Sequence, residues 1–194
     1  MGHRLQLHEK EHVMITYFKY NFDYSKQALL DFFDNLEKIQ SPTGKQRLKA
    51  VLPEGISNYE IFQPFFEQFP FVQKHDDSLD FSEIILDTLP QILPGANGVI
   101  IFPISGTVSL KTYKFKFSDP TSTWTYAIKP RDVLTTTMIN DIESTLIETV
   151  LIDSPIVVNG QSTHSYQIDG TPKILSLKIP LSVSWDTVVT ALSA

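Results

Sequence analysis

Two histidines and one aspartate give the clearest chemical signal in this sequence. His75 opens the string His75-Asp76-Asp77, so His75 and Asp77 stand two residues apart. On a strand, side chains at i and i+2 point to the same side and can share one metal ion. With a distant histidine they would form the two-histidine, one-carboxylate Fe(II) site, which leaves positions open for oxygen and a co-substrate. His164 is the candidate third ligand.

These residues also have an ordinary structural interpretation. The string KHDDSLD is equally typical of a polar, solvated loop, and this interpretation of His75 is favoured. His3, His8 and His12 have no carboxylate pattern beside them, so they are set aside as a metal site. The chain has no Cys, which excludes disulfides, thiolate metal sites and a cysteine nucleophile. It also has no G-x-S-x-G, P-loop or G-x-G-x-x-G motif.

Two further groups have a functional and a structural interpretation. Asp141, Glu143 and Glu148 contain a possible carboxylate pair for glycoside chemistry, but their alternation with apolar residues favours a solvated strand face. Trp124 and Tyr126 stand two apart and are candidates for stacking on a sugar. Aromatic residues with this spacing are more often part of a core, which is the favoured interpretation.

The N-terminal elements that must position these residues are partly helical. Residues 14–22 are rich in aromatic and β-branched residues and predict a strand. Residues 25–40 have apolar residues at three- and four-residue steps and predict an amphipathic helix, with Asp23 or Ser25 as its N-cap. The segment that follows is rich in phenylalanine, which favours core packing over a binding groove. These phenylalanines are Phe62, Phe65, Phe66, Phe69 and Phe71.

From about residue 81 the chain changes to short apolar or alternating runs separated by turn residues at intervals of 8–12 residues. This regularity predicts an antiparallel sandwich or jelly roll of about eight strands. A slip in the alternation near Lys111 and Thr112 predicts a bulge, and Ser184 is the predicted cap of a last, short helix. The expected strands are 82–89, 98–106, 107–117, 123–128, 144–152, 154–160, 163–168 and 172–180.

The length and composition indicate one α+β domain. We expect residues 1–13 to be a leader or disordered arm, and residues 14–194 to be a single domain. Within it we expect an α-rich part at 14–80, a β-core at 81–182 and a C-terminal helix at 183–194.

The charge and apolar content exclude several partners and locations. The formal charge of −6 argues against binding to nucleic acid or to anionic lipid. No run approaches 18 apolar residues, and the N-terminus lacks the apolar region of a signal peptide, so a soluble cytosolic protein is expected.

Two blocks in the β-region carry a resemblance to a known family. The first is VIIFPISGT, and the second runs from PIVVN through His164 and Lys173 to a strand containing LSL. In order and spacing, residues 81–182 resemble the C-terminal half of the 2-oxoglutarate/Fe(II)-dependent oxygenases. They are similar in particular to the short oxygenase-like proteins of phages and marine bacteria and to the aspartyl/asparaginyl hydroxylase-like group.

The resemblance implies a double-stranded β-helix (a jelly-roll, cupin-like fold) with an N-terminal helical layer. It implies that His164 is the distal iron ligand and that Lys173, where the family usually has arginine, anchors the co-substrate, with Asn159 beside that site. Fe(II) and 2-oxoglutarate would be the cofactors of an active protein, and an inactive one would have none.

The sequence departs from the family at the proximal H-x-D. The family has this motif in the loop before the strand VIIFPISG, where this chain has LPQILPGANG, without His or Asp. Either His75 and Asp77 are recruited with His164, or the iron site is lost, and the second alternative is favoured.

Three hypotheses about function therefore remain. The first is an Fe(II)/2-oxoglutarate-dependent hydroxylase. The second is a non-catalytic relative of phage origin, which would be a binding or structural module. It would join a protein partner or its own copies in the cytosol or a virion. The third is an unrelated jelly roll, such as a carbohydrate-binding or virion component.

Overall fold

The computed structural model describes residues 16–41, 46–72, 78–88, 90–93, 95–116 and 143–193. It is a mostly antiparallel β-sheet with a few helices. The predictions for residues 1–13, for Trp124, Tyr126 and Asp141, and for the strand at 123–128 lie outside the described residues. None of the described helices is long and apolar enough to cross a membrane.

The N-terminal part contains a short strand, a capped helix and a helical segment rich in phenylalanine. Ser25 caps α1 as predicted, because its hydroxyl oxygen accepts a hydrogen bond from the backbone N–H of Ala28 at 3.1 Å. The helix ends earlier than predicted, since residues 38–40 pair as a strand with residues 48–50. The elements are β1 (Tyr17–Lys19), α1 (Lys26–Asp34), β2 (Lys38–Gln40), β3 (Arg47–Ala50), η1 (Ile56–Asn58), η2 (Glu60–Phe62) and α2 (Gln63–Gln68).

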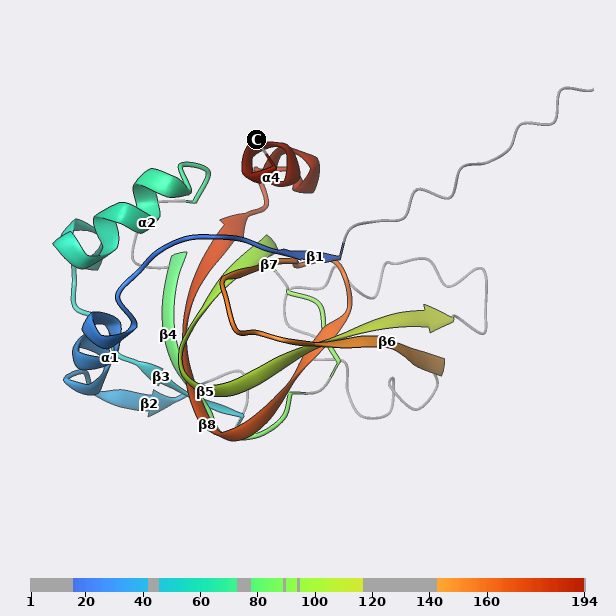
Figure 1. The fold of residues 1–194 in the computed structure, drawn as a ribbon, viewed down its shortest axis with the longest axis horizontal. Coiled ribbons are helices and arrows are strands. Elements are labelled where there is room, and N and C mark those ends of the chain that lie inside the picture. The colour runs from blue at the N-terminus through green and yellow to red at the C-terminus, as the bar shows by residue number, and fades with distance from the viewer. Residues whose placement is uncertain are drawn as a thin grey trace, which may run out of the picture.

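The β-region is dominated by two long strands that run antiparallel to each other. In Figure 1, β5 and β8 curve together through the middle of the molecule, with α1 and α2 on one side and the far ends of β5 and β6 on the other. The predicted C-terminal helix is present as α4, capped by the Ser184 hydroxyl. The elements are β4 (Leu79–Ile84), β5 (Ala96–Lys116), β6 (Glu143–Leu151), β7 (Ile156–Asn159), β8 (His164–Pro180) and α4 (Trp185–Leu192).

Each long strand replaces two predicted strands. The turn expected at Ser105 and Gly106 is a place where β5 bends, because its register with β8 shifts there while the pairing continues. Gly106 has a φ of 73°, and a Cβ on it would lie 2.7 Å from the Cα of Pro172, so glycine is required. The predicted bulge near Lys111 and Thr112 is confirmed, because the β5–β6 register shifts between Thr112 and Tyr113.

The bends divide the sheet into two rows of strands. The first row contains β7, the N-terminal half of β5, the C-terminal half of β8 and β4, and it is extended by β1 at one edge and by β3 and β2 at the other. The second row contains β6, the C-terminal half of β5 and the N-terminal half of β8. Thr88 and Gln91 complete the second row, because their backbones hydrogen-bond to Tyr166 and His164 of β8.

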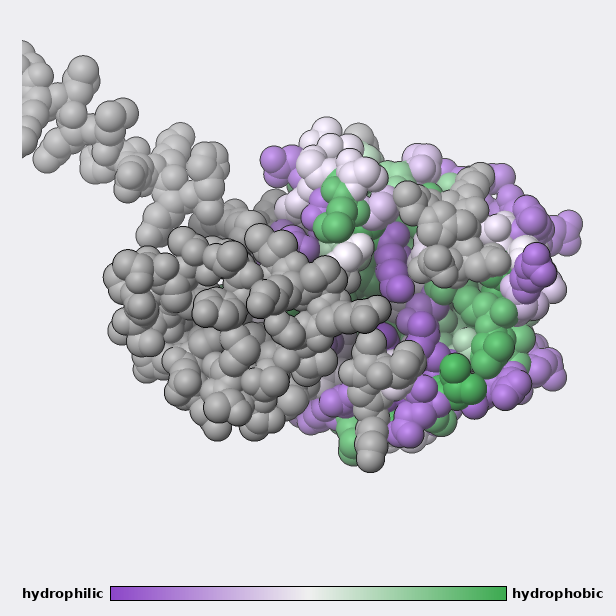
Figure 2. Space-filling model, turned by 180° about the vertical axis from the view of Figure 1, so that it is seen from behind, coloured by the Kyte–Doolittle hydropathy of each residue, from purple (hydrophilic) through white to green (hydrophobic). Residues whose placement is uncertain are grey.

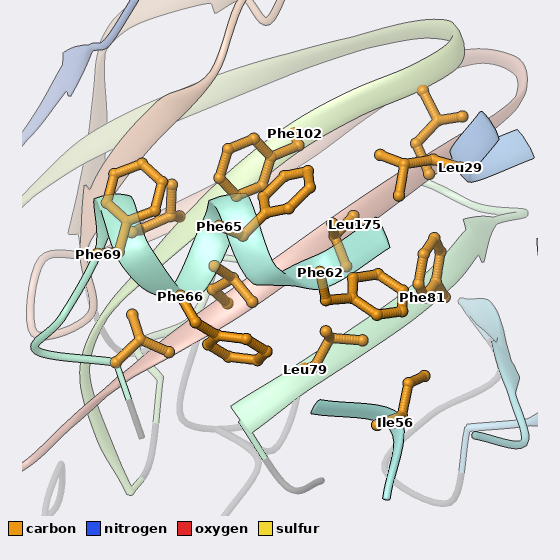
Figure 3. Close-up of a cluster of buried hydrophobic side chains, with 14 of the residues drawn as sticks. Leu29, Ile56, Phe62, Phe65, Phe66, Phe69, Leu79, Phe81, Phe102 and Leu175 are labelled. Atoms are coloured by element: carbon orange, nitrogen blue, oxygen red, sulfur yellow. The ribbon is translucent and has the colours of Figure 1, made fainter. Parts of the chain in front are cut away.

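Two hydrophobic cores lie on the two faces of the first row. The outer core packs the helices against the sheet, and Figure 3 shows its phenylalanines close to β4, β5 and β8. Core packing of the phenylalanine-rich segment is confirmed: Phe62, Phe65, Phe66 and Phe69 are at most 2% exposed, and Phe71 packs against them partly buried. The inner core takes residues from both rows and therefore lies between them. Its members are Ile84, Val99, Ile101, Val108, Leu110, Ile152, Ile156, Val158, Tyr166 and Ile174.

The surface mixes polar and apolar side chains. The face opposite to that of Figure 1 carries a band of hydrophilic residues next to smaller hydrophobic patches (Figure 2). Among the described residues, the most exposed large apolar side chains are Leu181, Leu86 and Ile147, in separate parts of the chain, at 59%, 57% and 57% exposure. Scattered exposed apolar residues of this kind are ordinary for a folded domain.

Candidate functional site

His164 opens β8 in the second row, with neighbours on both sides. Its Cα is paired with Thr112 of β5 on one side and with Gln91 on the other. The Gln91 pairing consists of two backbone hydrogen bonds, of 2.8 and 3.0 Å, which join the N–H and C=O groups of the two residues. The His164 side chain is fully buried, at 0% exposure.

The hydrogen bonding of His164 fixes which of its ring nitrogens carries the proton. Nδ1 lies 2.8 Å from the carbonyl oxygen of Ser162, which can only accept, so Nδ1 is the N–H donor. Nε2 is then an unprotonated acceptor, and it has no hydrogen-bond partner among the described residues. Burial lowers the pKa of His164, an effect that the Ser162 hydrogen bond partly opposes. The imidazole is therefore neutral, and its ring lies edge-on to Tyr166 with a centroid distance of 5.6 Å.

Two neighbours of His164 also have unpaired buried polar atoms. Within the described residues, the Thr112 hydroxyl, which is opposite His164 across the ladder, has no hydrogen-bond partner, and neither does the Ser162 hydroxyl. Buried polar groups nearly always have a partner, and each unpaired one costs about 1–3 kcal/mol. Three such groups at one end of β8 mark this end as the candidate functional site.

The residues beside His164 do not complete a metal site. The loop in which the resemblance expects the proximal H-x-D contributes one residue paired with His164, and that residue is Gln91. Two residues further on, Leu93 packs against the inner core, and its backbone N–H donates to the carbonyl oxygen of Gly160 at 2.7 Å. No group of three or more His, Cys, Asp or Glu side chains with metal-binding geometry occurs within the part of the chain that the structure describes. His75 and Asp77 lie outside the described residues.

Lys173 lies on the other side of β8. Its Nζ is 2.6 Å from Oδ1 of Asp34 on α1 and 5.4 Å from the ring centroid of Phe33, which belongs to the outer core. His164 instead contacts Tyr166, a member of the inner core. The structure therefore does not bring Lys173 and His164 together, and the role of Lys173 as a co-substrate anchor stays a prediction.

Asn159 shapes the turn that leads into β8. Its Oδ1 accepts a hydrogen bond from the backbone N–H of Gln161 at 3.0 Å, and its C=O accepts one from the N–H of Ser162 at 3.1 Å. This arrangement is an Asx-turn, a common structural use of asparagine. It positions the Ser162 carbonyl that orients His164, while a contact of Asn159 with a cofactor stays a prediction.

Of the three acidic residues expected on a solvated strand face, Glu148 is exposed on β6, in agreement with that interpretation. Burial and the hydrogen bond with Glu148 together raise the pKa of Tyr17. The described surface also has a depression between Lys26, Gly106 and Asp153, and none of the candidate residues lines it.

A charged cluster on the inner face of the first row was missed by the sequence reasoning. Asp80 of β4 is only 3% exposed, and its Oδ2 lies 3.3 Å from Nζ of Lys49 and 3.7 Å from Nη1 of Arg47. The sequence signal that could have found Asp80 is an aspartate between the apolar residues Leu79 and Phe81, whereas its proximity to Arg47 and Lys49 follows from strand pairing.

Comparison with known proteins gives weak structural similarity only. No protein-family model matches this chain, and no curated protein matches it either. Among solved structures, a hydroquinone 1,2-dioxygenase bound to Cd²⁺ and 4-hydroxybenzonitrile is 12% identical, with 55% of this chain covered and a TM-score of 0.34. The hydroxypropylphosphonic acid epoxidase of S. wedmorenis is 12% identical, with 75% of this chain covered and a TM-score of 0.35. An Fe(II)-HppE structure with the alternative substrate (S)-1-HPP is 11% identical, also with 75% of this chain covered and a TM-score of 0.35.

This chain spans between 56% and 59% of the length of these three proteins. Similarity at this level does not establish a shared function, so the conclusions below depend on the residues of this chain.

Proposed function

We propose that this protein is a double-stranded β-helix of the oxygenase-like kind that has lost its iron site and acts as a non-catalytic binding or structural module. The strand pairing supports the fold. Two facing rows of four segments, which share two long bent strands and enclose an inner core, are what a double-stranded β-helix requires.

The observation that carries the proposal is the pairing of Gln91 with His164. Gln91 belongs to the loop in which the family has its proximal H-x-D, and Leu93 follows it two residues later. An amide and an apolar side chain thus stand at the positions where this proposal expects metal ligands. An amide is a weak ligand and a leucine is none, and one histidine does not hold Fe(II) tightly. The residues described by the structure therefore do not fit Fe(II).

A second observation supports the same conclusion. The ion pair between Lys173 and Asp34 involves side chains that are 21% and 50% exposed, and it joins β8 to α1. In this position the lysine charge is balanced on the outer face, away from His164. A co-substrate at His164 would need another cation.

Anaerobic thermal unfolding with Fe(II) and 2-oxoglutarate tests the loss of the iron site. We expect no change in the unfolding midpoint of the wild-type protein. A ligand at about 100 times its Kd would raise the midpoint by about 5–10 °C in a chain of this size. A rise of that size that disappears in His164→Ala would contradict the proposal.

A gain-of-function variant gives the converse test. Gln91→His combined with Leu93→Asp installs the missing pair beside His164. We expect this variant to bind Fe(II), and we expect the same variant with His164→Ala not to bind it. Failure of a folded double variant to bind Fe(II) would show that positions 91 and 93 do not face His164 as proposed.

The runner-up is an Fe(II)/2-oxoglutarate-dependent hydroxylase that uses His75, Asp77 and His164. One observation favours it: Nδ1 of His164 donates to a carbonyl and leaves Nε2 unpaired, which is the usual arrangement of a metal-binding histidine. Fe(II) binding by the wild type that is lost in both His75→Ala and Asp77→Ala would establish this alternative.

A further inference from the structure

Asp80 is the one acidic residue that is buried among the described parts of the chain. Burying a carboxylate is costly unless nearby groups compensate its charge. The Ser82 hydroxyl donates to Oδ1 of Asp80 at 2.9 Å, and the two cations lie beside Oδ2, Lys49 at 3.3 Å and Arg47 at 3.7 Å. Two positive charges therefore lie beside the single negative charge of Asp80, so the three side chains together carry a net charge of +1.

Strand register places this cluster on the inner face of the first row. Arg47 is paired with Ile84, Lys49 with Ser82, and Asp80 with Ser176. Directly paired residues point to the same face of a sheet. Ile84 belongs to the inner core, and so does Ile174, which is paired with Ser82. The inner face is therefore apolar along β5 and β7 and charged along β3 and β4.

The two cations can be reached from solvent, whereas the carboxylate cannot. The side chains of Arg47 and Lys49 are 37% and 31% exposed, against 3% for Asp80. At 3.7 Å the Arg47 contact is an ion pair and not a hydrogen bond. Over the described residues, no second carboxylate lies within 4 Å of either cation. The cluster thus presents a net charge of +1 and the N–H donors of a guanidinium toward solvent.

The cluster is also close to the His164 site. Burial raises the pKa of Tyr166, and the positive charge of Arg47 opposes that rise, so Arg47 is near enough to act on the phenol. Tyr166 is the ring that contacts His164.

We propose that Arg47 and Lys49 form a binding site for a small oxyanion and that the natural ligand carries a carboxylate. A guanidinium binds a carboxylate through two parallel hydrogen bonds, and the single excess charge matches a single carboxylate. This inference goes beyond the proposed function, because it needs no metal and does not use His164 as a ligand.

Calorimetric titration of the metal-free full-length protein, with EDTA present, tests the site. The probes are succinate, 2-oxoglutarate and inorganic phosphate, each at matched ionic strength, with chloride as the control. We expect saturable binding of a carboxylate and a Kd raised about tenfold or more in Arg47→Gln and in Lys49→Gln. Lys49→Arg keeps the charge and should keep binding. Lys26→Gln removes one positive charge from an exposed helix position and should leave the Kd unchanged.

Three outcomes would overturn the inference. One is that the wild type shows no saturable binding of any probe. Another is an equal loss in Lys26→Gln and Arg47→Gln, which would show a general charge effect. The third is tight binding of phosphate without binding of the carboxylates, which would overturn the carboxylate assignment.

Lys173→Gln separates this inference from the family-like co-substrate site. Binding that is lost in Lys173→Gln and kept in Arg47→Gln would place the carboxylate at the co-substrate anchor and contradict the present assignment. Circular dichroism of each variant checks that a lost signal does not reflect unfolding.

Discussion

At the scale of single residues, His164 combines two properties that rarely occur together in a core. Its ring is fully buried and neutral, and one nitrogen has no partner among the described residues. The Asx-turn at Asn159 places the carbonyl that selects the tautomer. Nε2 of His164 is thus a buried hydrogen-bond acceptor without a partner among the described residues.

The lowered pKa of His164 makes folding stability depend on pH. Below about pH 6.5 the unfolded chain binds a proton at residue 164 that the folded chain does not, so this histidine contributes stability above that pH and the contribution is lost as the pH falls. The loss is at most about 1.4 kcal/mol per pH unit for one group. Urea unfolding at about pH 7.5 and 5.5 measures it.

The matched control for this prediction is His164→Asn, which keeps a polar side chain without a titrating ring. The free energy of unfolding should fall less on acidification in this variant than in the wild type. All other groups are the same in both proteins, so their contributions to the pH dependence cancel. An identical fall in both proteins would show that His164 is not the titrating group.

At the scale of elements, glycines determine how β5 and β8 bend from one row into the other. Gly106 and Gly170 both have positive φ values, of 73° and 75°. They differ in their surroundings, because a Cβ at Gly106 would meet Pro172, whereas nothing lies within 4 Å of a Cβ at Gly170. An alanine at Gly170 would therefore introduce backbone strain alone, whereas an alanine at Gly106 would introduce the same strain and a steric clash.

Gly106→Ala should destabilise the protein more than Gly170→Ala. Each substitution costs about 1–2 kcal/mol for the left-handed backbone conformation. Gly106→Ala should cost about 1–3 kcal/mol more, because the new Cβ would lie 2.7 Å from a backbone atom of β8. Chemical denaturation of both variants provides the comparison. Equal losses would mean that the β5–β8 pair opens readily to admit the methyl group.

At the scale of the whole molecule, the helical layer and the sheet are joined by aromatic packing. Phe102 on β5 is 0% exposed, and its ring contacts Phe22, Tyr24, Phe65 and Phe69 at centroid distances of 4.9–5.8 Å. Edge-to-face geometry of this kind adds to the burial energy. The outer core is therefore where the N-terminal segments and the β-region become one domain.

Phe102→Ala should cost about 3–5 kcal/mol of stability, since it leaves a cavity between the helices and the sheet. Leu181→Ala removes a side chain that is 59% exposed and should change stability by no more than about 0.5 kcal/mol. Thermal and chemical unfolding of the two variants measure this contrast. A small loss in Phe102→Ala would show that the helical layer is not held by this core.

The amino-acid sequence alone determined the helix caps, the burial of the phenylalanine-rich segment and the strand character of the β-region, because each depends on residues close together in the chain. Ser25 and Ser184 cap their helices because a side-chain oxygen can reach N–H groups within one turn. The phenylalanine-rich segment is core because five large apolar rings have to be buried. The alternation of apolar and polar residues predicted a mostly antiparallel sheet for the same reason, since side-chain direction on a strand repeats every two residues.

Only the tertiary structure decided which residues face one another. His164 and Lys173 are nine residues apart on β8, but the register shifts and Gly170 lie between them, so alternation cannot be counted from one to the other. Gln91 meets His164, and Arg47 meets Asp80, across ladders that join distant parts of the chain. Such pairings depend on register between strands, which no single segment encodes. The two candidate sites follow from those pairings.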